Sequence, residues 1–307
     1  MYDDFLPTGS DKEGEKYMTE FSKVGTQQIV LLVLGAVLMI AVPVAIAVLW
    51  TKKKKERFTT VLVGAATFLL FAVILEKPLQ ALLIAPTQLG LADTGISQFL
   101  NANPVLWAFI VGLFPGVFEE TGRLVAYKTV LKKRKNRETS ISHGIGHGGF
   151  EVIYLMGIAY VTYIVYAVMI NAGTFGSVVD QVRAQAPDQA DALIAAASGI
   201  ASFSFANLAL GIVERFFSVL FHIGASMIVF YACRDKGRFW LFPLAILLHT
   251  AMDFIAGLIT VGVWKLPVWA VEGIVAIFGV LTFCGAFFLL YKRDVARISI
   301  YEGVGKR

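Results

Sequence analysis

Seven long apolar segments constrain this chain more than any other feature of its sequence. Each is long enough to cross a bilayer as a helix, since a spanning helix needs about 20 mostly apolar residues. The segments are residues 28–50, 59–82, 104–127, 141–170, 206–232, 239–261 and 268–291. Only 16% of residues are charged, where an ordinary soluble domain carries about 25%. The sequence therefore predicts an all-α, polytopic membrane protein with seven transmembrane helices.

Basic residues between the segments predict the orientation of the bundle. Clusters of Lys and Arg follow the first, third, fifth and seventh segments, at residues 52–57, 132–137, 234–238 and 292–293. The other connections carry few basic residues. Because basic residues concentrate on the cytoplasmic side, we expect the N-terminus outside and the C-terminus in the cytoplasm.

The chain then divides into an extracytoplasmic N-terminal segment (1–27), a membrane domain (28–291, core helices in 104–261) and a cytoplasmic tail (292–307). The longest connection, residues 171–203, is predicted outside, with a short surface helix over residues 188–200. The net charge of +5 does not indicate nucleic acid as a partner. The basic residues adjoin apolar segments, where they orient the chain and attract the lipid bilayer.

Ionisable residues inside the apolar segments mark the candidate site, because charges in hydrocarbon are costly. They are Glu119, Glu120 and Arg123 in segment three, His143, His147 and Glu151 in segment four, Glu214, Arg215 and His222 in segment five, and His249 and Asp253 in segment six. Counted at 1.5 Å per residue from the cytoplasmic ends, one group falls in a layer roughly 10–20 Å deep: Glu119, His147, Glu151, His222 and His249. A shared depth predicts a shared site.

The chemistry of such a layer is limited. Imidazole and carboxylate together suit a divalent metal, with zinc the first candidate. A glutamate can act as general base towards water, and a metal-bound water can attack a peptide carbonyl. A second imidazole and an arginine can stabilise the resulting oxyanion. The glycines between His143 and Glu151 indicate close helix packing rather than catalysis.

The spacing leaves three alternatives open. Glu119 and Glu120 point about 100° apart on a helix, so one faces the site and the other pairs locally, with Arg123 as the expected partner. His143 lies near the predicted membrane surface. Its side chain is either solvated or lipid-facing, or it is a ligand in the site. Glu214 and Arg215 fall higher in the bilayer and are expected to form an ion pair or to balance another charge.

At these residues the sequence resembles a known superfamily. Glu119-Glu120-x-x-Arg123 resembles the first motif of the CAAX-protease and bacteriocin-processing (CPBP) proteins, usually Glu-Glu-x-x-x-Arg, and His249-x-x-x-Asp253 resembles their last motif. The segment from Gly146 to Glu151, with the segment containing His222, looks most like the YhfC branch of bacterial intramembrane metalloproteases; the PrsW proteases are similar. Two departures stand out: the arginine is one residue closer than usual, and His143 replaces the phenylalanine of the usual Phe-x-x-x-His motif.

The resemblance implies a glutamate-activated water, histidine ligands or oxyanion donors, and a cavity open towards the cytoplasmic side. We therefore predict an intramembrane endopeptidase of the bacterial plasma membrane that hydrolyses membrane-associated peptide or protein substrates through a glutamate-activated, metal-bound water. The predicted metal ligands are His147, His222, His249 and Glu120. The predicted catalytic residues are Glu119, Glu120, Arg123, His147, Glu151 and Asp253.

Two other functions remain open from the sequence. An ion-coupled transporter also uses buried His and Glu, but it favours internal repeats, and none is detected in the sequence. A non-catalytic membrane scaffold would not need the full set of acidic residues and histidines that this chain carries. Both observations favour the enzyme.

Overall fold

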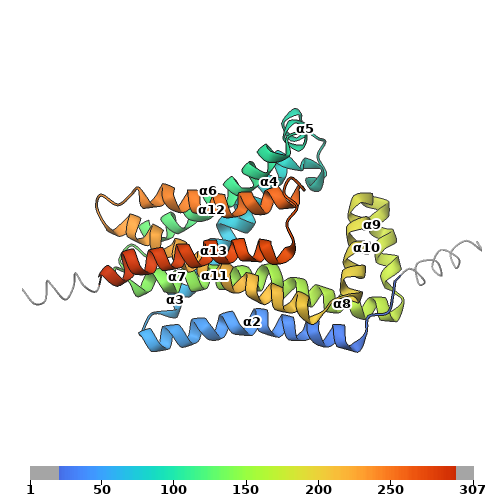
Figure 1. The fold of residues 1–307 in the computed structure, drawn as a ribbon, viewed down its shortest axis with the longest axis horizontal. Coiled ribbons are helices and arrows are strands. Elements are labelled where there is room, and N and C mark those ends of the chain that lie inside the picture. The colour runs from blue at the N-terminus through green and yellow to red at the C-terminus, as the bar shows by residue number, and fades with distance from the viewer. Residues whose placement is uncertain (1–20, 295–307) are drawn as a thin grey trace, which may run out of the picture. The chain divides into compact units, whose positions relative to one another are not determined.

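The computed structural model describes residues 21–294, apart from the side chains of residues 187 and 188, and each predicted apolar segment is helical (Figure 1). The helices of the seven segments are α2 (Thr26–Lys54); α3 (Phe58–Phe68), η1 (Leu69–Glu76) and α4 (Lys77–Ile84); α6 (Pro104–Lys128); α7 (Glu138–Val152), η3 (Ile153–Gly157) and α8 (Ile158–Ala172); α11 (Phe205–Arg234); α12 (Leu241–Thr260); and α13 (Val268–Ala286) with η4 (Phe287–Tyr291).

Within the described residues, seven helical stretches are long and apolar enough to cross a membrane. The prediction of an all-α, multi-pass membrane protein is thereby confirmed, while the orientation of the termini stays a prediction. Most of the predicted N-terminal segment (1–27) and cytoplasmic tail (292–307) lies outside the described residues.

The connections contain more helix than the sequence predicted. The expected surface helix is confirmed as α10 (Pro187–Ala201), but the stretch before it, expected to be loop, is helix α9 (Phe175–Gln185). Phe175 and Val179 lie one turn apart and are both buried, so this short helix is stabilised by its packing. Two further short helices, η2 (Pro86–Leu89) and α5 (Gly95–Asn101), follow α4 and were not predicted.

The chain forms two compact units. Among the described residues, the first contains 21–40 and 154–211, and the second contains 41–153 and 212–294. In the first unit the side chain of Asn171 exchanges two hydrogen bonds with the backbone of Val24. Every predicted site residue lies in the second unit, so the site is built within one compact body.

Glycines let the helices of the second unit approach at backbone distance. Helices α6 and α12 lie side by side (Figure 1), and a Cβ added at Gly112 would stand 2.5 Å from the backbone nitrogen of Phe254. Between α7 and α11, a Cβ at Gly148 would lie 3.0 Å from the Cβ of His222. The prediction that the glycines serve packing is confirmed. Close approach also brings the polar side chains of different helices within hydrogen-bonding reach.

Substituting Gly112 by valine tests this packing. We expect Gly112→Val to lower the free energy of unfolding by about 1–3 kcal/mol, because the added side chain must displace the α12 backbone. Gly273→Val on α13 is the matched control, since a Cβ there meets no atom within 4 Å. Unfolding by SDS titration in mixed micelles measures both variants. Equal stability of the two would show that α6 and α12 are not packed as described.

Candidate metal centre

Three side chains from three helices form the centre of the site. Glu119 of α6, His222 of α11 and His249 of α12 are all buried, and each turns one possible ligand atom to within 4.8 Å of the others. Glu119 Oε2 lies 3.8 Å from His222 Nδ1 and 3.9 Å from His249 Nε2. We call these three residues the central triad. Residues more than a hundred positions apart are thus brought together.

A second carboxylate holds the outer nitrogen of each imidazole in the triad. His249 Nδ1 lies 2.8 Å from Glu120 Oε1, and His222 Nε2 contacts Glu151 Oε2. With His249 Nδ1 bonded to Glu120 and His222 Nε2 in contact with Glu151, His249 Nε2 and His222 Nδ1 are the nitrogens turned towards Glu119. The adjacent residues Glu119 and Glu120 therefore face different parts of one site.

Arg123 joins the two glutamates to His222. Its side chain is fully buried; Nη1 donates to Glu120 Oε1 at 2.6 Å, and Nη2 lies 3.7 Å from Glu119 Oε2. Nη2 also donates to His222 Nδ1 at 2.6 Å, and Nε donates to Ser226 Oγ at 3.3 Å. The sequence expected Arg123 to pair with one local glutamate. Its guanidinium instead lies beside both carboxylates, offsetting one of their two charges, and bonds to one histidine.

His147 contacts the central triad from α7. Its Nε2 lies 2.8 Å from Glu119 Oε2 and donates to that carboxylate. Its Nδ1 is buried and has no hydrogen-bond partner within residues 21–294. A neutral imidazole that donates from Nε2 accepts at Nδ1, so His147 retains one acceptor beside the centre.

The position of His143 decides one alternative that the sequence left open. Its ring is fully buried, which excludes a solvated or lipid-facing position. Nδ1 lies 3.2 Å from Ser226 Oγ and Nε2 lies 3.4 Å from Thr67 Oγ1. His143 is therefore linked through Ser226 to Arg123, and it lies outside the central triad.

Helix α11 supports the site along one face. Arg215 donates to Glu151 Oε1 at 3.1 Å and also pairs with Glu214, so the expected Glu214–Arg215 ion pair is found and also anchors a site residue. Ser218 Oγ lies 3.3 Å from the same Glu151 oxygen. Ser218 and Ser226, which the sequence reasoning missed, stand four residues before and after His222. That helical spacing was the signal that could have identified them.

Asp253 and Glu76 complete the ionisable surroundings. Asp253 Oδ2 lies 3.5 Å from His249 Nε2, and its side chain is 29% exposed. Glu76, expected only at the outer end of segment two, is fully buried, with Lys77 Nζ 3.0 Å from its Oε1. The sequence offered no clear signal for Glu76, because the π-helical turns of η1 alter the face on which it falls.

The predicted site residues thus converge, and their roles can be assigned more closely. Of the predicted metal ligands, His222 and His249 belong to the central triad. Glu120 and His147 contact the triad, each bound to one of its members, and their ligand role stays a prediction. The carboxylate of the triad is Glu119, which we predicted from the sequence as a base but not as a metal ligand.

The donor set fits a divalent metal. Two imidazoles and one carboxylate are the protein ligands of one common type of catalytic zinc site, which keeps a further position open. Carboxylates on the outer nitrogens of ligating histidines are usual around such sites. Ion binding at His222 Nδ1 requires that this atom give up its hydrogen bond from Arg123. When that hydrogen bond is lost, Glu119 and Glu120 lie close enough to hold the guanidinium of Arg123.

Fold and site together define a multi-pass membrane protein with a buried histidine–carboxylate centre. The chain belongs to the YhfC intramembrane metalloprotease family, whose model matches residues 38–275. It is 28% identical over 260 residues to an uncharacterized membrane protein, YhfC, of Bacillus subtilis (strain 168); the match covers 84% of this chain and 95% of that protein. No solved structure matches the chain.

The Arg123–Glu120 pair can be tested by a double-mutant cycle. We expect Arg123→Met to destabilise the protein by about 3–5 kcal/mol, because it leaves two buried carboxylates without their cation. Glu120→Gln in the same chain should recover part of that loss, so the double variant is less destabilised than the sum of the single variants. SDS titration measures each corner, with the exposed Lys132→Met as a control. Simple additivity would contradict the pairing.

Proposed function

We propose that this protein is an intramembrane endopeptidase that hydrolyses peptide bonds of membrane-associated peptides or proteins. The observation that carries the proposal is the position of Glu119, whose Oε2 faces two imidazole nitrogens at 3.8 and 3.9 Å in a buried centre. A carboxylate beside two imidazoles suits water activation, and family membership points to the same chemistry.

Zinc is the metal that this centre suits best, and Glu119, His222 and His249 would hold it. A bound divalent cation polarises the peptide carbonyl and makes water a stronger acid at neutral pH. Glu151 and Glu120 act as positioning residues, because each fixes the outer nitrogen of one histidine.

Glu119 is also the proposed proton acceptor: its Oε2, which faces the two histidines, would hold the metal, and its Oε1 would take the proton. Its Oε2 is held by His147 at 2.8 Å, and the described residues provide no hydrogen bond to its Oε1. Glu120 also has an oxygen without a hydrogen bond within residues 21–294, Oε2. It is less suited because its side chain is fully buried and its Oε1 already accepts from Arg123 and His249. In the proposed reaction Glu119 takes a proton from the attacking water. It then returns that proton to the amine nitrogen as the C–N bond breaks.

Arg123 and Asp253 take different supporting roles. The hydrogen bonds of Arg123 are directed to Glu120, His222 and Ser226, so it positions the centre rather than binding substrate. Asp253 adjoins His249 Nε2 and is the most exposed carboxylate at the centre. It therefore lies where the peptide bond would approach the histidine.

Cleavage assays on single variants test the proposal. Purified protein in liposomes is incubated with a library of synthetic transmembrane peptides, and mass spectrometry detects the products. We expect Glu119→Gln to lower the rate at least about 100-fold, because it removes the proposed base and one proposed metal ligand. We expect Glu272→Gln, a carboxylate of α13 outside the centre, to retain activity. Cleavage by Glu119→Gln at the wild-type rate would reject the assignment.

The same assay separates Glu119 from Glu120. Glu120→Gln keeps a hydrogen-bond acceptor for Arg123 and His249, so a smaller loss is expected than for Glu119→Gln. A larger loss in Glu120→Gln would make Glu120 the base. No cleavage of any peptide by well-folded wild-type protein would count against the proposed activity.

A further inference from the structure

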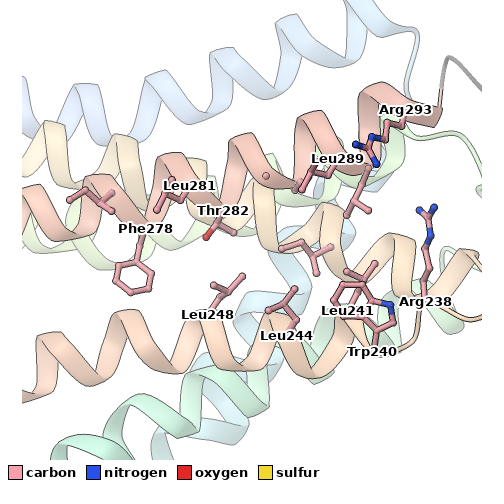
Figure 2. A pocket seen from close by; sticks show the side chains of 15 residues that line it. Arg238, Trp240, Leu241, Leu244, Leu248, Phe278, Leu281, Thr282, Leu289 and Arg293 are labelled. Carbon is pink, nitrogen blue, oxygen red and sulfur yellow. The ribbon is translucent and has the colours of Figure 1, made fainter.

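An apolar groove runs between α12 and α13, and none of its lining residues belongs to the metal centre. Figure 2 shows Leu244 and Leu248 of α12 on one side, with Phe278 and Leu281 of α13 on the other. The groove has a volume of about 530 Å³. Its α13 wall includes Gly285, where an added Cβ would meet no atom within 4 Å. The groove is therefore open space and not a packed interface.

Two guanidiniums stand at one end of this groove. Arg238 precedes α12 and Arg293 follows η4, and Figure 2 shows both at the same end of the lining. Arg238 pairs with Asp235 at 3.0 Å, and no ion pair of Arg293 is found in the described part of the chain. Trp240 lies at the same end and is 61% exposed. Basic residues and tryptophan at one end of an apolar groove are typical of the lipid headgroup level.

The chemistry of the lining favours a lipid over a peptide. Its polar side chains are Arg238, Trp240 and Arg293 at one end and the hydroxyl of Thr282 farther along. An extended peptide in hydrocarbon needs partners for each backbone N–H and C=O, and this lining offers few. A fatty-acyl chain needs none. Guanidiniums bind phosphate through a matching fork of N–H groups, and a phosphate is the anionic group of a phospholipid.

We propose that this groove binds one anionic phospholipid, with its phosphate between Arg238 and Arg293 and an acyl chain along α12 and α13. The groove wall also supports the metal centre. Leu248 and Phe278 pack against a buried cluster that contains Phe221, whose ring lies 5.1 Å from that of His249. The bound lipid stabilises the helix that carries His249.

Native mass spectrometry of the purified full-length protein tests the site. The protein in detergent is mixed with phosphatidylglycerol or with phosphatidylcholine of the same acyl chains, and the bound lipid is counted. We expect one phosphatidylglycerol to be retained at least about tenfold more strongly than phosphatidylcholine. Because the acyl chains are identical, this preference reports on the headgroup alone.

Two matched pairs of variants locate the lipid. Arg238→Gln/Arg293→Gln should abolish the preference for phosphatidylglycerol. Lys236→Gln/Lys292→Gln removes two neighbouring charges that do not line the groove, so this control should keep the preference. Gly285→Leu should block the acyl chain, whereas Gly273→Leu on the same helix should not. A melting-temperature increase with added phosphatidylglycerol, lost only in the groove variants, would confirm the site and show that they fold.

Three results would overturn the proposal. The first is equal retention of the two lipids by the wild-type protein. The second is equal loss in both charge pairs, which means that phosphatidylglycerol is held by the general basic surface. The third is phosphatidylglycerol retention by Gly285→Leu at the wild-type level, which means that the acyl chain lies elsewhere.

Discussion

The fully buried guanidinium of Arg123 is the interaction on which the rest of the site depends. Two adjacent glutamates inside a membrane helix repel each other and are costly to bury as charges. Arg123 bonds to Glu120 at 2.6 Å and lies 3.7 Å from Glu119 Oε2, so both carboxylates share one cation. The same side chain reaches His222 and Ser226 on α11. One residue of α6 therefore organises charges from the helices packed around it.

Helix packing makes this sharing of charge possible. At Gly144 and Gly112 the backbone of a neighbouring helix lies so close that an added Cβ would stand 2.5 Å from it. Short side chains such as those of Glu119, Ser218 and Ser226 then reach across to another helix. Because these interactions are made within one compact unit, Glu119, His222 and His249 are brought together by that unit alone.

Much of this was predictable from the sequence, because a bilayer restricts the chain to spanning helices and makes buried charge costly. The seven segments and the convergence of Glu119, His222 and His249 followed from hydropathy and depth counting. The different contacts of Glu119 and Glu120 did not follow from the sequence, since they depend on which face of α6 meets α11 and α12. The burial of His143 was missed because depth along a helix does not reveal lateral contacts with Ser226. The burial of Glu76 was missed because the π-helical turns of η1 depart from the regular helical period.

The central claim is that α6, α11 and α12 form a single metal centre from one carboxylate and two imidazoles. The most direct measurement is the metal content of the purified protein, followed by X-ray absorption spectroscopy of the bound ion. We expect one zinc per chain with two imidazole nitrogens among its ligands, lost in His222→Ala/His249→Ala and kept in His143→Ala. Active protein without metal, or zinc retained equally by the double variant, would contradict it.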